Sequence, residues 1–181
     1  LDAYKDYYKK YRSEENRMQL AVAYNNCAIE YANRKKWRSA EKNLKQAIRL
    51  DSKNNRFKTS LANMYQSRAN EAASKERWNS AERYYRKAYD LTGAEGDARS
   101  LANVIGMRGR ERMEDNNLKA AKLDFQKALQ YDRDNANLKA WLSEVMYRLE
   151  GKTDNAKKML EEAAEDGYGG ARKRLDQFEG E

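Results

Sequence analysis

The chain has 181 residues, of which 36% are charged and 40% apolar, with nine glycines and neither proline nor histidine. Scarce turn residues predict a helix-rich soluble protein. Without histidine, Ser-His and Cys-His nucleophiles are excluded and the commonest metal ligand is missing. The longest apolar run, Leu20–Tyr24, has five residues, far below the roughly 20 that span a membrane. No catalytic, cofactor or metal residue is assigned.

The net charge of +8 is unevenly distributed. Residues 1–90 hold 21 Lys and Arg against 11 Asp and Glu, whereas residues 91–181 hold 16 against 18. A basic first half favours acidic protein segments, nucleic acid or an anionic membrane surface. The compartment stays open, because a start at Leu1 fits both a cytoplasmic protein and an exported one, with or without preceding repeats.

The first predicted element is a partial helix within residues 1–16. Ala3 and Tyr7 are spaced like a small and a bulky packing residue, but Lys10 occupies the next small position. This helix is therefore predicted to be the remnant of a preceding helix pair.

Four helix pairs follow, over about 21–54, 62–95, 102–135 and 137–170. The second helix of each carries a small, a bulky and a small residue at offsets of four and three, which fall on one face of an α-helix. These sets are Ala40, Leu44 and Ala47; Ala81, Tyr85 and Ala88; Ala121, Phe125 and Ala128; Ala156, Leu160 and Ala163. Because neither helix buries its stripe alone, stacked pairs are expected.

The first helices carry a second stripe, exemplified by Ala28 and Tyr31 and, in the third pair, by Gly109. With Trp37, Trp78 and Leu118 ahead of the second helices, the chain resembles the tetratricopeptide repeat (TPR) family. The resemblance implies an all-α, right-handed α-solenoid of antiparallel helix pairs, forming a single domain over residues 1–181 with a capping helix at 171–179.

Two features depart from the family pattern. Equivalent alanines lie 41, 40 and 35 residues apart, against a family unit of about 34, so residues 55–61 and 96–101 are predicted to lengthen helices and to give repeats of about 40 residues. The family proline after the second helix is also missing. Turn and cap chemistry is therefore expected from Asp51, Asn54, Gly93, Asp134 and Asn135.

Polar residues follow the first helices on the side away from the packing stripe. In the TPR family this side lines a concave groove, where amides can bond both C=O and N–H of a bound peptide. The alternative is an ordinary solvated surface. The predicted groove residues are Asn25, Asn26, Asn33, Asn63, Gln66, Ser67, Asn70, Asn103 and Arg110.

One variant of the family reads acidic chaperone tails with a clamp of Lys, Asn, Asn, Lys and Arg. That clamp is not reproduced, because its places are taken by Asn25, Ile29, Ser67, Asn103 and Met107. In the fourth pair the groove side is apolar, with Leu138, Trp141, Leu142, Val145 and Leu149. We expect Leu175 and Phe178 to cover it, the alternative being a partner or a second copy.

Three further residues have packing and functional interpretations. Cys27 falls on an apolar stripe, so a small buried residue is favoured over a reactive thiol. Trp37 and Trp78 occupy equivalent places in two repeats, which favours packing over ligand contact. In each case the packing interpretation is preferred.

The predicted function is a non-enzymatic scaffold that binds a protein or peptide in the groove, with acidic segments among the expected partners. A structural or self-assembling subunit is the first alternative. Nucleic-acid binding is the second, through basic residues with interleaved Tyr84 and Tyr85. The partner, the process and the oligomeric state do not follow from the residues.

Overall fold

The computed structural model describes residues 1–180, and the side chains of residues 1–176. Within that range it contains ten α-helices and no strand. The helices are α1 Asp2–Lys10, α2 Glu14–Asn33, α3 Trp37–Leu50, α4 Asn55–Ala73, α5 Trp78–Thr92, α6 Glu95–Glu114, α7 Leu118–Leu129, α8 Ala136–Glu150, α9 Asp154–Glu165 and α10 Gly169–Gly180. None of the helices in the described range is both long and apolar enough to cross a membrane.

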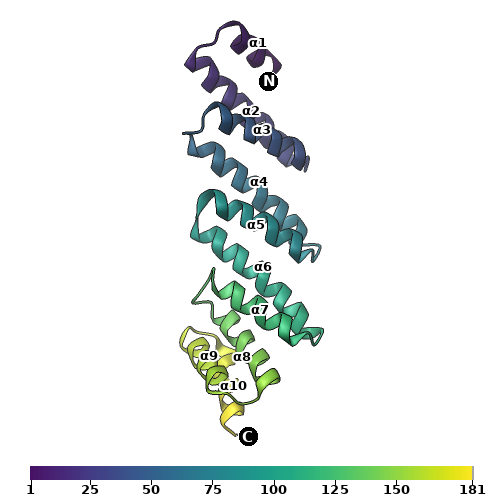
Figure 1. The fold of residues 1–181 in the computed structure, drawn as a ribbon, viewed down its shortest axis with the longest axis vertical. Coiled ribbons are helices and arrows are strands. Elements are labelled where there is room, and N and C mark those ends of the chain that lie inside the picture. Colours follow the sequence, from purple (N-terminus) through teal and green to yellow (C-terminus); the bar gives the residue numbers. More distant parts are fainter. Residues whose placement is uncertain (181) are drawn as a thin grey trace. The chain divides into compact units, whose positions relative to one another are not determined.

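The chain divides into two compact units, residues 1–97 and 98–181. In the first unit α2 packs on α3, and α4 on α5, as antiparallel neighbours joined by short turns (Figure 1). In the second unit α8 packs on α7 and α9, and α10 packs on α9. Sequential packing of helix pairs confirms the predicted all-α, TPR-like fold class and its C-terminal capping helix.

Local chemistry explains several helix ends. The Asn54 and Asn135 side chains accept hydrogen bonds from the Arg56 and Leu138 backbone N–H groups, at 3.2 Å each. They thereby satisfy donors left open by the first turn. Gly93 ends α5 with a φ of 61°, a left-handed conformation that glycine adopts without steric cost. These three residues act as predicted.

The repeated small positions form the contact surface between helices. All eight alanines of the signature are fully buried, and the bulky residues Leu44, Phe125 and Leu160 lie beside them. The second repeat differs, because Tyr84 is buried and Tyr85 only half-buried. Tyr84 stacks on Tyr65 of α4, with ring centroids 6.3 Å apart. The neighbouring tyrosine therefore takes the core position that the spacing assigned to Tyr85.

The helix lengths agree in part with those predicted from the sequence. Helices α4 and α6 include residues 55–61 and 96–101, as expected for longer first helices. Helix α2 begins at Glu14, before the expected start of the first pair, and the partial helix is confined to Asp2–Lys10. A lengthened-repeat variant of the family remains a prediction.

The apolar residues of α8 lie in the core, contrary to the prediction of a patch that needs a cover. Leu138, Leu142 and Val145 are buried. Leu138 packs against Gly106 of α6, and the Trp141 ring lies 5.7 Å from that of Phe125. The α10 residue Leu175 packs instead with Ala140, Leu160 and Ala163. The Phe178 side chain lies outside the described residues.

Candidate protein-binding surface of helices α2 and α4

Helix α2 presents an exposed apolar stripe with amides in it. Met18, Val22, Asn26, Ile29 and Asn33 follow one another at helical spacing and are exposed or partly exposed, Met18 and Val22 at 47% each. Their positions correspond to one face of the helix. Asn26 and Asn33 thus lie on the predicted surface, with apolar neighbours that the sequence did not single out.

A shallow cavity lies at the start of this stripe. It has a volume of about 630 Å³ and is lined by Tyr4 of α1 and by Met18, Val22, Ala23 and Asn26 of α2. Glu14, Glu15 and Gln19 complete the lining. Apolar walls with a few amides are typical of sites that hold a side chain and orient a nearby backbone.

Helix α4 lies against α2 and exposes a polar stripe of Thr59, Asn63, Ser67, Asn70 and Ser74. The three hydroxyls bond back to backbone carbonyls of α4 at 3.0 to 3.1 Å. The Asn70 Oδ1 accepts a hydrogen bond from the Tyr85 hydroxyl. Among the described residues no group bonds the Asn63 amide, so Asn63 and the Asn70 NH₂ are the groups available to a ligand.

Two predicted groove residues do not share this surface. Gln66 is half-buried and donates to Asp97, which also accepts from the Thr92 hydroxyl. Asn25 is half-buried, and its Oδ1 is enclosed without a hydrogen-bond partner among the described residues. Both residues therefore face the interior of the first unit. The spacing of residues along a single helix did not predict this orientation.

Asn103 and Arg110 belong to the second unit. They are exposed and lie seven residues apart on α6, hence on one face of that helix. Arg110 Nε donates to Glu114 Oε1 at 3.0 Å. These two residues thus belong to a different compact unit from the α2 and α4 stripes.

The tryptophans at equivalent repeat positions differ in their bonding. Trp37 Nε1 donates to Glu71 Oε2 at 2.9 Å, linking α3 to α4, whereas Trp78 Nε1 is buried with no partner among the described residues. Hydrogen bonds from Lys75 and Trp37 hold the pKa of the Glu71 carboxyl below its ordinary value. Trp37 therefore packs and also orients a carboxylate.

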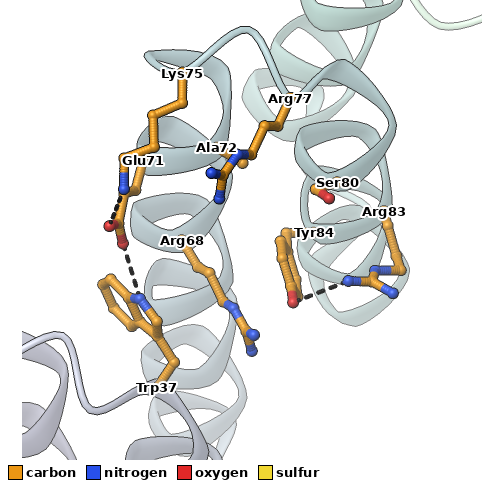
Figure 2. Close-up of a pocket in the computed structure, with 9 residues that line it drawn as sticks. All are labelled: Trp37, Arg68, Glu71, Ala72, Lys75, Arg77, Ser80, Arg83 and Tyr84. Atoms are coloured by element: carbon orange, nitrogen blue, oxygen red, sulfur yellow. Dashed lines mark hydrogen bonds and ion pairs between the residues drawn. The ribbon is translucent and has the colours of Figure 1, made fainter.

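A second cavity, of about 350 Å³, opens between α4 and α5 beside Trp37. Figure 2 shows Arg68 and Arg77 reaching into the space between these helices, with the Tyr84 ring on its α5 side. Neither arginine stands out in the sequence, because each is one of many basic residues of the first half. Their proximity depends on the packing of α4 on α5.

The remaining sequence candidates have structural roles. Cys27 is half-buried rather than buried. In the described part of the chain no group of three or more Asp, Glu or Cys side chains is arranged to hold a metal ion. The aromatic face of Tyr84 is occupied by Arg68, whose Cζ lies 4.1 Å from the ring centroid. Tyr84 is therefore not a platform for stacked bases.

The fold is TPR-like. No family model matches the sequence, and no curated protein does. Among solved structures the chain is similar to Pseudomonas aeruginosa PilF, at 17% identity over 89% of this chain and 85% of that one, with a TM-score of 0.45. It is similar to YrrB, titled a TPR protein with an unusual peptide-binding site, at 17% identity over 97% and 81%, with a TM-score of 0.44. MamA aligns at 15% identity over 90% and 84%, with a TM-score of 0.42.

Proposed function

We propose that this protein is a non-enzymatic scaffold that binds a peptide segment of another protein on the joined surface of α2 and α4. The observation that carries the proposal is the placement of exposed apolar side chains. Of the seven large hydrophobic residues exposed among the described side chains, six lie between Tyr4 and Ile29. Concentrated apolar exposure marks interaction surfaces, whereas scattered single residues do not.

The two stripes have complementary chemistry. Met18, Val22 and Ile29 of α2 supply apolar contact area, and Asn26, Asn63 and Asn70 supply amide groups. An amide bonds peptide N–H and C=O without regard to side chain. A segment lying across both helices would therefore be held by its backbone at α4 and selected by its apolar side chains at α2.

Affinity capture with matched variants tests this function. Val22→Asp puts a charge into the apolar stripe, and Leu123→Asp makes the same change at a residue that is 67% exposed on α7. Proteins captured by the wild type should be lost with Val22→Asp and retained with Leu123→Asp, with both variants as helical as the wild type. Equal recovery with all three proteins would refute the α2 surface.

Self-association is the second candidate, because the same apolar stripe would serve a second copy of the chain. Sedimentation equilibrium of the purified protein distinguishes the two functions. A molar mass that rises with concentration for the wild type but not for Val22→Asp would replace the peptide proposal with self-assembly. A constant monomer mass, together with capture that depends on Val22, would support the peptide scaffold.

A further inference from the structure

The cavity between α4 and α5 carries an excess of positive charge. Its lining includes the cations Arg68, Lys75, Arg77 and Arg83 against the single carboxylate of Glu71. Lys75 Nζ bonds Glu71 Oε1 at 2.8 Å, so this carboxylate is already paired. Among the described residues no carboxylate pairs with Arg68, Arg77 or Arg83. Three arginines thus surround one cavity without a negative partner.

The aromatic wall fixes two of these arginines. The Cζ atoms of Arg68 and Arg83 lie 4.1 and 4.9 Å from the Tyr84 ring centroid, and Arg83 Nη2 donates to the Tyr84 hydroxyl at 3.1 Å. Figure 2 shows the ring between the two guanidinium groups. A guanidinium held against an aromatic face loses little freedom when it binds an anion. Two of the three arginines are therefore held in place before a ligand arrives.

Contact with the Tyr84 ring accounts for the positions of Arg68 and Arg83, but it does not neutralise the charge of any of the three arginines. Like charges around one cavity repel one another, and none of the three arginines closes an ion pair in the described part of the chain. Arg77 precedes α5 as its N-cap residue, and its guanidinium carries only donors, so it cannot cap the N–H groups of that helix. An anion in the cavity would remove the repulsion and accept N–H bonds from the guanidinium forks.

We propose that the cavity of Arg68, Arg77 and Tyr84 binds carboxylate side chains of an acidic peptide segment in a protein partner. This rests on the proposed scaffold function and adds a second contact with its own specificity. A volume of about 350 Å³ suits a side chain or two and not a folded element. A nucleic-acid strand needs a basic groove along its backbone and open aromatic faces for its bases. Here the cations surround one cavity and the Tyr84 face is covered, so acidic side chains are the better fit.

Glu71 has a defined place in this proposal. Its carboxylate, held by Trp37 and Lys75, is the one negative charge in the lining and competes with an incoming carboxylate for Lys75. Glu71→Gln keeps an acceptor for the Trp37 indole while removing that charge. This variant therefore raises the affinity for an acidic peptide, whereas loss of an arginine lowers it.

Fluorescence anisotropy with a fluorescein-labelled ten-residue glutamate peptide tests the site, and the matching glutamine peptide is the neutral probe. The wild type should bind the glutamate peptide and not the glutamine peptide. Arg68→Gln with Arg77→Gln should weaken binding at least about tenfold, the effect of losing two charge-assisted contacts. Glu71→Gln should strengthen binding by about threefold or more.

The control variant is Arg49→Gln with Arg56→Gln, which also removes two positive charges, but from exposed positions on α3 and α4 that lie outside the cavity lining. Arg56 lies twelve residues before Arg68 on α4, about 18 Å along the helix. This control should change the affinity by less than about threefold. Equal weakening by both double variants would overturn the proposal and leave only nonspecific attraction to a basic protein.

Two further measurements decide the remaining outcomes. If a uridine oligonucleotide with the same number of charges binds more tightly than the glutamate peptide and depends on Arg68 and Arg77, the occupant is nucleic acid and the proposal is wrong. Circular dichroism must show each variant folded. The Val22→Asp protein should bind the glutamate peptide like the wild type, so failure of the α2 surface and failure of this cavity are separate results.

Discussion

The Arg108 guanidinium and the Asp124 carboxylate form a two-point ion pair inside the second unit. Arg108 Nε lies 2.9 Å from Asp124 Oδ2, and Nη2 lies 2.6 Å from Oδ1. Arg112 Nη1 reaches the same carboxylate at 2.8 Å. Asp124 therefore joins α7 to α6 at two arginines, in surroundings where it is almost completely buried.

Asp124→Ala should destabilise the second unit by about 3–5 kcal/mol, because it breaks a buried ion pair and removes the carboxylate that Arg108 and Arg112 share. Urea unfolding followed by Trp141 fluorescence, with Trp37 and Trp78 replaced by Phe, reports on this unit. Glu114→Ala removes the partner of exposed Arg110 and should cost less than about 1 kcal/mol. Similar losses for the two variants would contradict the assigned role of Asp124.

Two glycines of α6 should respond to alanine with opposite signs. A Cβ on Gly109 would lie 2.8 Å from Cε1 of Phe125, whose side chain is fully buried. Gly109→Ala should therefore cost about 1–3 kcal/mol through overpacking. Gly96 has open space at the same position, so Gly96→Ala should stabilise by up to about 1 kcal/mol. Thermal unfolding of both variants measures the difference, and a neutral Gly109→Ala would contradict the close packing of α6 on α7.

The equivalent tryptophans should tolerate phenylalanine unequally. Trp37→Phe removes a hydrogen bond to the Glu71 carboxylate and should therefore lower the free energy of unfolding. Trp78→Phe removes a buried N–H without a partner among the described residues, so its cost should be smaller and confined to lost packing. Denaturant unfolding of the two variants provides the comparison. A larger loss for Trp78→Phe would show that its indole N–H has a partner in solution.

Stability should depend on pH through Glu41. Burial acts to raise the pKa of its carboxyl, but hydrogen bonds from Lys45 and from the Tyr65 hydroxyl outweigh it and hold the pKa below the ordinary 4.5. A lowered folded-state pKa gives stability that is present above pH 4.5 and is lost as the pH falls through the folded pKa. The wild type should therefore exceed Glu41→Gln in stability near pH 7, on the order of 1 kcal/mol.

Urea unfolding of the wild type and the Glu41→Gln variant from roughly pH 7 down to about pH 2.5 measures this difference in stability, which should close in acid. Tyr65→Phe removes one of the two hydrogen bonds, Tyr65 Oη to Glu41 Oε1 at 2.8 Å. In the Tyr65→Phe background, the loss of stability caused by Glu41→Gln should be smaller. A difference that is constant with pH would exclude Glu41 as its source.

Burial or exposure could be predicted from the sequence for residues that recur at a fixed helical spacing. The eight signature alanines recur at offsets set by the helix itself, so their burial followed without any knowledge of neighbouring helices. Asn26, Asn63 and Asn70 were placed on exposed faces for the same reason. Tyr84 is buried where the spacing predicted Tyr85, which shows the limit of predicting burial from spacing. Adjacent residues differ by only about 100° around the helix axis.

The sequence by itself determined the helix pairs, their small-residue contacts and the basic character of the first half. Periodicity and charge are properties of the chain, so packing partners are not needed to read them. Only the tertiary structure decided that Gln66 turns inward to Asp97, that Leu138 is covered by α6, and that Arg68 and Arg77 meet beside Tyr84. Each of these depends on which side chains two helices bring together, and residues far apart in sequence carry no local signal of that contact.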